Sequence, residues 1–317
     1  MKKFLVIILS LVILLSVSSY IFIPSTLQIS KADYAQCNVY GADRVLSNNN
    51  TWSKWWPGSS SSSANNDSSG TKSFSYNGFD YQLSQKFYNA IEVKMRTKHS
   101  IIDSRIVLIK IQNDSVILDW HCNLSTSMNP VTRILKYKEA EKIRNNMSTI
   151  LSNLSSFLGD KKNLYGVNFN VVMSKDSTMV VTKKVSKEYP STADIYQLVG
   201  NLKQYIASQG AKESNYPMLH VKSLDDSTFE TMVAIPVNKK LAGNATISFS
   251  RFVPWKVLTA EVIGGNKTVE QALKQMKVLI GDYQISTMAI PFESLVTDRS
   301  KETDTSKWVT NIYTPVP

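Results

Sequence analysis

The stretch Ala245–Ile280, ATISFSRFVPWKVLTAEVIGGNKTVEQALKQMKVLI, decides the fold of the second half of the chain. Its β-branched and aromatic residues predict two strands, at 245–253 and 255–263. A Gly-Gly-Asn turn at 264–266 then leads into a predicted helix over 268–280. The quoted stretch therefore predicts two strands followed by a helix.

The same order of elements occurs earlier in the chain, which indicates an internal duplication. Downstream of the quoted stretch, closing strands are predicted at 286–296 and 309–313. The upstream elements are predicted strands at 167–173 and 178–184, a helix over 194–208, and strands at 218–221 and 229–237. Two such halves predict one antiparallel sheet with both helices on one face and a groove where the halves meet.

Three segments of this half carry a resemblance to a known family. They are Val253–Gly265 before the helix, Pro291–Asp298, and Thr310–Val316 with its Thr-x-Ile-Tyr-x-Pro-Val pattern. With these segments the half resembles the GyrI-like small-molecule-binding domain, the effector-binding module of AraC-type and MerR-type bacterial transcription activators. Asn311 stands where the family commonly has glutamate, and Leu295 stands where it has an aromatic residue.

A groove of this kind predicts a binding site for an apolar or cationic molecule. Aromatic walls stabilise a ligand by burial, at about 25 cal/mol per Å², and attract a cation by roughly 0.5–2 kcal/mol. The candidate groove residues are Glu293, Trp255, Trp308, Tyr313, Phe292 and Glu261. The alternatives are a solvent-facing carboxylate for Glu293 and core or rim packing for the two tryptophans.

The first half predicts an antiparallel sheet followed by a long helix. From Lys72 to Arg133 apolar and polar residues alternate, which is typical of strands with one solvated face. A helix is predicted over 134–158, where apolar residues recur at spacings of three and four. Ahead of the sheet we expect a short strand at 26–29 and a short helix over 31–46.

The densest aromatic cluster of the chain is Trp52-Ser53-Lys54-Trp55-Trp56-Pro57. Together with the opening strand and the closing helix, it gives residues 26–158 a resemblance to the START-related superfamily, also called the polyketide cyclase and dehydrase family. That fold wraps its sheet around the long helix, and its members bind lipids or other apolar molecules in the gap. The resemblance implies that Trp52, Trp55 and Trp56 contact a ligand, and packing in the core is the alternative.

Two further segments precede or interrupt this half. Phe4–Ile23 has 20 residues without charge or proline and follows Lys2-Lys3. Twenty helical residues cover roughly the 30 Å of a bilayer interior, and the positive-inside rule places the remainder of the chain on the far side. A cleaved signal peptide is the alternative, and it exports the same residues. The Ser-, Asn- and Gly-rich segment 58–71 predicts a mobile loop.

Charge and cysteine content exclude several classes of function. The net charge of +11 comes from scattered lysines, and no pair of short helices precedes residue 167, so we predict no nucleic-acid partner. His99, His121 and His220 show no metal-ligand spacing, so neither a metal nor another cofactor is predicted. Cys37 and Cys122 predict either one disulfide or two buried thiols.

The sequence as a whole predicts an α+β chain in three parts. These are a transmembrane anchor at 1–24, a helix-grip antiparallel-sheet domain at 25–160, and a duplicated β-α-β-β effector-binding domain at 166–317. We expect a membrane-anchored bacterial protein of the cell envelope or periplasm that holds an apolar, amphipathic or cationic small molecule, as a sensor or carrier.

Two alternatives remain open at this point. One is a hydrolase that uses Glu293 and Tyr313 as base and acid, although no nucleophile elbow, phosphate loop or dinucleotide fingerprint supports an enzyme. The other is an envelope interaction protein whose cavities are filled by its own side chains.

Overall fold

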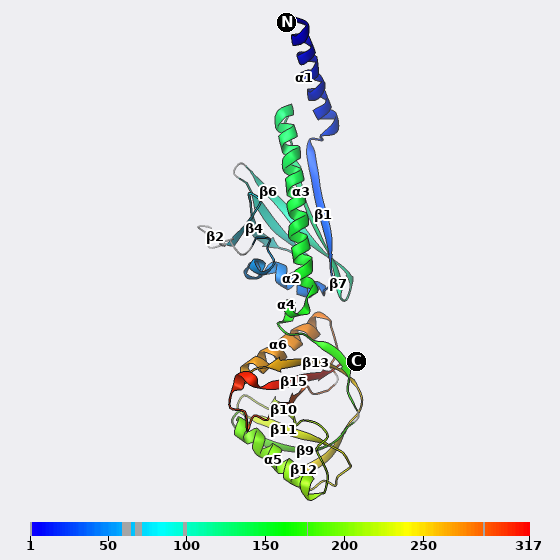
Figure 1. The fold of residues 1–317 in the computed structure, drawn as a ribbon, viewed down its shortest axis with the longest axis vertical. Helices are drawn as coiled ribbons and strands as arrows, with labels where there is room; N and C mark the ends of the chain where they lie inside the picture. The colour runs from blue at the N-terminus through cyan, green and yellow to red at the C-terminus, as the bar shows by residue number, and fades with distance from the viewer. Residues whose placement is uncertain (1, 59–64, 67–71, 98–99, 176, 288) are drawn as a thin grey trace. The chain divides into compact units, whose positions relative to one another are not determined.

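The computed structural model describes residues 2–58, 65–66, 72–97, 100–175, 177–287 and 289–317. The chain divides into two compact units, Met1–Leu164 and Tyr165–Pro317. Each unit contains one antiparallel sheet with packed helices (Figure 1). The predicted α+β class with two antiparallel sheets is confirmed.

The first unit is built on a seven-stranded sheet in the order β1-β7-β6-β5-β4-β3-β2. Its strands are β1 (Thr26–Ala35), β2 (Asn65–Asn66), β3 (Lys72–Tyr76), β4 (Phe79–Lys86), β5 (Ala90–Arg96), β6 (Ile101–Gln112) and β7 (Ser115–Ser125). Asn77 and Gly78, with φ of 52° and 80°, make the turn between β3 and β4. Apart from Gly58 and β2, the segment 58–71 lies outside the described residues.

The long helix of this unit is α3 (Pro130–Gly159), which packs on β1 and β7. Pro130 occupies the first turn, and the Asn129 side chain accepts hydrogen bonds from the backbone N–H groups of Val131 and Thr132. The helix therefore begins four residues before the predicted start. The shorter helices are α2 (Val39–Ser47), η1 (Asn49–Lys54) and α4 (Lys161–Tyr165).

The predicted helix over 31–46 is partly wrong, because β1 continues to Ala35. Its whole length pairs with β7, from Thr26 opposite Ser125 to Ala35 opposite Val116. This ladder satisfies the backbone groups of 31–35, so tertiary pairing outweighs the local helical pattern. The helix α2 starts only after Asn38, whose side chain caps it.

The helix α1 (Lys2–Phe22) covers the predicted anchor. Its described apolar side chains, among them Phe4, Leu11 and Ile21, are exposed. Among the described residues, no helix has the combination of length and apolar character that crossing a membrane requires. Membrane anchoring is not supported by the structure and stays a prediction.

The two cysteines of the first unit are free and buried. Burial raises the pKa of the Cys37 thiol to about 12 and that of the Cys122 thiol to about 12. Of the two predicted alternatives, the structure has two buried thiols, and neither is activated as a nucleophile.

The second unit is built on an eight-stranded sheet in the order β12-β9-β11-β10-β14-β15-β13-β8. Its strands are β8 (Asn170–Met173), β9 (Ser177–Ser186), β10 (Met218–Ser223), β11 (Phe229–Val237), β12 (Ile247–Phe252), β13 (Lys256–Ile263), β14 (Phe292–Leu295) and β15 (Val309–Pro315). The helices are α5 (Thr192–Ser208) and α6 (Asn266–Asp282).

The strand order has the two-fold symmetry that the predicted internal duplication requires. Exchanging β8 with β12, β9 with β13, β10 with β14 and β11 with β15 reverses the order and leaves the sheet unchanged. The two halves therefore meet where β10 pairs with β14, which we call the seam. The strand predicted at 286–296 is shorter than expected, because only Phe292–Leu295 pairs with its neighbours.

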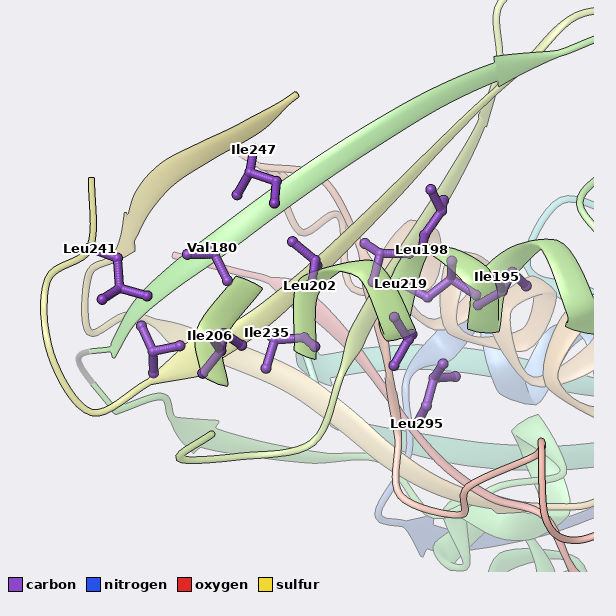
Figure 2. Packing of buried hydrophobic residues seen from close by; sticks show 13 residues of the cluster. Val180, Ile195, Leu198, Leu202, Ile206, Leu219, Ile235, Leu241, Ile247 and Leu295 are labelled. Carbon is purple, nitrogen blue, oxygen red and sulfur yellow. The ribbon is translucent and has the colours of Figure 1, made fainter. Parts of the chain in front are cut away.

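The core of the second unit lies between α5 and the sheet (Figure 2). The helix begins with a capping box formed by Ser191 and Asp194. It buries Ile195, Leu198, Val199, Leu202 and Ile206 against Val180, Leu219, Val233, Ile235, Val237, Leu241, Ile247 and Leu295. The core contacts come from both halves, since Leu219 lies on β10 and Leu295 on β14.

The start of α6 depends on Gly264, at the end of β13. Its φ of +137° belongs to a region that residues with a side chain rarely adopt. A Cβ at this position would lie 2.7 Å from Thr268 Oγ1. The backbone N–H of Gly264 donates to the Trp308 carbonyl at 2.8 Å, which ties the strand-to-helix turn to the residue before β15.

Candidate functional site

The two strands at the seam pair over only two positions, Met218 with Ser294 and Leu219 with Glu293. Because side chains alternate along a strand, each pair projects to one face of the sheet. Leu219 packs in the α5 core, so Glu293 lies on the same face as the helices. We call this the helix face and the opposite one the open face.

The helix α6 covers the same face as α5. Thr314 Oγ1 donates to Met276 Sδ of α6 at 3.0 Å. Ile312 is two residues from Thr314 on β15, so both side chains project to the same face. Glu293 is opposite Ile312, so all three residues of β14 and β15 face the helices. The prediction of both helices on one face is therefore confirmed.

Glu293 lines a pocket of about 480 Å³ at the seam. The other walls are mainly apolar side chains of α6 and of the strands, namely Leu219, Val221, Leu273, Met276, Ile280 and Phe292, with Tyr189, Lys222 and Lys277 also lining it. The Glu293 side chain is 16% exposed. The structure thus holds a nearly buried carboxylate against a cavity with apolar walls.

The ion-pair partner of Glu293 is Arg299, with 3.8 Å between Oε2 and Nη2. This arginine is 6% exposed and is held by other groups. Its Nη2 donates to Thr310 Oγ1 at 2.7 Å, its Nη1 donates to Asn266 Oδ1 at 3.2 Å, and Cζ lies 4.9 Å from the centre of the Trp308 ring. The guanidinium therefore compensates Glu293 through charge rather than through a hydrogen bond.

Burial dominates the electrostatics of this pair. Desolvation raises the pKa of Glu293, and the positive charge of Arg299 opposes that rise. Desolvation likewise lowers the pKa of Arg299, and Glu293 opposes that change. Within the described residues no hydrogen-bond donor to the Glu293 carboxylate is present, so its charge is only partly compensated.

The open face carries an aromatic group at the same seam. Phe292 stacks on Tyr313 with ring centres 4.9 Å apart, and Phe252 meets Phe292 edge-on at 5.6 Å. Phe252 belongs to β12, four strand spacings from β14, or about 19 Å in a flat sheet. The sheet therefore curls toward the open face and brings these rings together.

Two pockets lie on the open face, with volumes of about 410 and 240 Å³. Both are lined by Met218, Phe252 and Phe292, which therefore separate them. The larger one also contains Met179, Met232 and His220. Pockets of this size at the seam contradict the alternative of cavities filled by the protein's own side chains.

The candidate residues of the second unit divide between several environments. Glu293 lies on the helix face, whereas Phe292 and Tyr313 stack on the open face. Trp308 packs on Arg299, and its indole N–H donates to the Glu302 carbonyl at 2.9 Å. Trp255 is 45% exposed, outside the pockets described above.

The Glu293–Tyr313 acid–base pair is wrong as a geometric proposal. The register places Glu293 opposite Ile312 and Tyr313 opposite Phe292, so the two side chains project to opposite faces of the sheet. A base and an acid must both reach one substrate, which this arrangement prevents. The hydrolase alternative thus loses the residues on which it depended.

The three tryptophans of the first unit form a packed cluster. Trp52, Trp55 and Trp56 are 1, 4 and 2% exposed, and the rings of Trp52 and Trp56 stack at 5.5 Å with 6° between their planes. Phe74 contacts Trp52 and Trp56. The structure brings these residues together in the interior, and ligand contact by them stays a prediction.

Two functional candidates were absent from the residues predicted for the site. Arg299 lies in the connection between β14 and β15, where an Asp-Arg-Ser sequence gives no sign of burial. His220, which has no metal-ligand spacing in the sequence, lines both the 480 Å³ and the 410 Å³ pocket. The available signal in the sequence is a polar residue between the apolar residues Leu219 and Val221 of β10.

Comparisons with known proteins give only distant matches. No protein-family model and no curated protein matches the chain. The C-terminal domain of EcmrR is similar with a TM-score of 0.42 and 15% identity, over 48% of this chain and 98% of that one. SAV2435 bound to tetraphenylphosphonium gives 0.33 and 20%, over 47% and 94%. The Zhui aromatase/cyclase from Streptomyces sp. R1128 gives 0.31 and 7%, over 41% and 92%.

The TM-scores of these matches are all below 0.5, so neither the predicted fold families nor a function follows from them. Both resemblances, and the absence of a nucleic-acid partner, stay predictions.

Proposed function

We propose that the second unit binds an apolar or cationic small molecule at the seam of its sheet, with Glu293 as the charge partner of a cation. One observation carries this proposal. A nearly buried carboxylate faces a pocket of about 480 Å³, and its nearest cation stands 3.8 Å away without a hydrogen bond to it.

The charges around the pocket favour a cation over an anion deep inside it. Lys222 and Lys277 also line the pocket, but both are exposed, so solvent and salt screen them. The Glu293 side chain is only 16% exposed, and an opposite charge interacts more strongly with a carboxylate that is largely out of water. Arg299 is held by hydrogen bonds to Thr310 and Asn266 and makes no hydrogen bond to the carboxylate. A lipophilic cation in the pocket adds a second, closer positive charge to the carboxylate.

A matched pair of ions tests the proposal. Tetraphenylphosphonium and tetraphenylborate have nearly the same shape and opposite charge. We expect the full chain to bind the cation more tightly than the anion, and Glu293→Gln to weaken cation binding about tenfold or more, which is the effect of losing a charged interaction of about 1.5–3 kcal/mol. Calorimetric titrations at one detergent concentration make partitioning into micelles the same for every variant.

Glu261→Gln is the control, since Glu261 is an exposed carboxylate on β13 of the same unit. We expect it to leave both affinities unchanged. Because burial raises the Glu293 pKa, cation affinity of the wild-type chain should decline on acidification at a higher pH than for an ordinary glutamate. Equal affinities for the two ions, unaffected by Glu293→Gln, contradict the proposal.

We further propose that the protein acts as a sensor or carrier in the cell envelope, attached to the membrane through residues 4–23. The support is the sequence of this segment and the exposure of its described apolar side chains. We expect the full chain to remain in the membrane pellet after alkaline carbonate extraction. Leu11→Arg places a charge in the middle of the segment, at a cost of about 2.5–3.5 kcal/mol, and should release the chain. Release of the wild-type chain into the carbonate supernatant contradicts this attachment.

A further inference from the structure

His220 stands at the point where the two strands of the seam separate. The strands β10 and β14 pair only through Met218 and Leu219, so from His220 onward β10 leaves its neighbour. The resulting gap has a pocket on each side, and His220 lines both of them. Across β10 and β11, His220 is directly opposite Met232.

The two nitrogens of the His220 ring differ in their surroundings. The Pro291 backbone, which has only a carbonyl to offer, lies close enough to the ring to favour its protonated form. Nε2 is shielded from solvent and has no hydrogen-bond partner. A neutral ring carries one N–H and one lone pair, and with the N–H on Nδ1 the lone pair of Nε2 is satisfied neither by the described residues nor by solvent.

The 410 Å³ pocket that His220 lines has mainly apolar and adaptable walls. Met179, Met218 and Met232 line the 410 Å³ pocket together with Phe252 and Phe292. Met218 and Met232 are only partly buried, and methionine side chains adjust to different ligand shapes. The lining also includes Lys183, Ser248 and Ser250. Nε2 itself is shielded, so a guest reaches it when the methionine side chains shift. Such sites take apolar molecules and orient them by a few hydrogen bonds.

We infer that Nε2 of His220 accepts a hydrogen bond from the ligand, and that the ligand is an aromatic or aliphatic molecule carrying an O–H or N–H donor beside its apolar body. This inference rests on the proposed function, because it assumes that the unit binds a small molecule at the seam. The inference adds the chemical class of ligand that the 410 Å³ pocket of the open face selects. Molecules of the same shape without a donor leave Nε2 unsatisfied and bind less tightly.

The protonation state of His220 supports this role. Burial lowers its pKa, and the Pro291 carbonyl and the charge of Glu230 oppose that change. Lys222 and Lys183 lower the pKa further, and Lys183 is itself paired with Glu230 at 3.4 Å. The imidazole is therefore neutral near neutral pH, and its lone pair is available. Acidification below the lowered pKa converts Nε2 into a donor and removes the acceptor.

A pair of probes in which a methyl group replaces the donor hydrogen tests the inference. 2-Naphthol carries an O–H, and 2-methoxynaphthalene carries a methyl ether at the same place. We measure both affinities on the full chain and on His220→Phe, which keeps a ring at the position. The ratio of the two affinities should favour 2-naphthol in the wild-type chain and fall about tenfold in the variant, the effect of one buried hydrogen bond.

Met232→Leu is the matched control, since it changes the residue opposite His220 without touching a polar group. It should leave the ratio unchanged even where it weakens both probes. If His220→Phe does not fold, the ratio is followed in the wild-type chain on acidification, and it should fall as His220 becomes protonated.

Three outcomes overturn the inference. They are a ratio that is the same in the wild-type chain and His220→Phe, a ratio in the wild-type chain that does not change on acidification, and no binding of either naphthalene to the wild-type chain. The proposed function is decided separately by the tetraphenyl ions and Glu293→Gln. A failure of the naphthalene pair alone therefore removes His220 from the site and leaves Glu293 in place.

Discussion

Replacing Arg299 with methionine is expected to lower the free energy of unfolding of the second unit by about 3–5 kcal/mol, the usual cost of removing one partner of a buried ion pair. The arginine is 6% exposed, and its removal leaves the Glu293 carboxylate without its cation. It also leaves the buried hydroxyl of Thr310 without the 2.7 Å hydrogen bond from Nη2. Methionine keeps much of the apolar volume that lies against Trp308.

The loss should depend on pH, with a sign that follows from the Glu293 pKa. Burial already raises this pKa, and removal of Arg299 raises it further, because Arg299 is the group that opposes the rise. A carboxyl whose folded pKa exceeds its unfolded value contributes stability that is complete below the unfolded pKa and is lost as the pH increases through the folded pKa. The deficit of Arg299→Met should therefore shrink on acidification.

Urea unfolding followed by hydrogen exchange of peptides from the second unit measures the effect, with the first unit as internal reference. In Arg299→Met/Glu293→Gln the unpaired charge is gone, so we expect part of the lost stability to return. Lys301→Met is the control, because its side chain is 83% exposed in an ion pair with Asp298 and should cost about 1 kcal/mol or less. A double variant as unstable as Arg299→Met contradicts the coupling of Arg299 and Glu293.

The duplicated sheet could be predicted because its signal repeats along the chain. The strand–helix–strand–strand order occurs in both halves, and the eight strands of the structure keep that order. The sequence predicts less well which residues face the groove, because it indicates a strand but not the register in which that strand pairs. Glu293 and Tyr313 are separated by the alternation of side chains once β14 pairs with β15.

Other parts of the site depend on long-range contacts that leave no local pattern. Arg299 is buried because Thr310, Asn266 and Trp308 meet it from other segments. His220 gains its importance from the end of pairing between β10 and β14, which only the structure shows. The same reason applies to β1, where pairing with β7 converts part of a predicted helix into strand.

Trp52→Ala is expected to lower the free energy of unfolding of the first unit by about 3–5 kcal/mol, because it removes a buried aromatic side chain from a packed cluster. Trp52 is 1% exposed and lies 5.4 to 5.5 Å, between ring centres, from Trp55, Trp56 and Phe74. Its indole N–H donates to the Leu46 carbonyl at 3.0 Å. That carbonyl belongs to the last turn of α2, where carbonyls lack partners within the helix.

Two milder substitutions distinguish a core cluster from a ligand contact. Trp52→Phe and Trp55→Phe remove the same volume, but only the first leaves a buried carbonyl unsatisfied. Trp55 Nε1 is buried and has no partner among the described residues. If the tryptophans only pack, Trp52→Phe should cost about 1–3 kcal/mol more than Trp55→Phe, measured by urea unfolding and hydrogen exchange of the first unit.

The reverse result has a specific meaning. Equal losses for the two variants require an acceptor at Trp55 Nε1, which a bound water or ligand supplies. Adding the extract from which the chain was purified distinguishes a bound ligand from a bound water. A ligand in the extract increases the stability of the wild-type chain and not that of Trp55→Phe. A difference of 1–3 kcal/mol with no effect of the extract instead assigns all three tryptophans to the core and leaves ligand binding to the second unit.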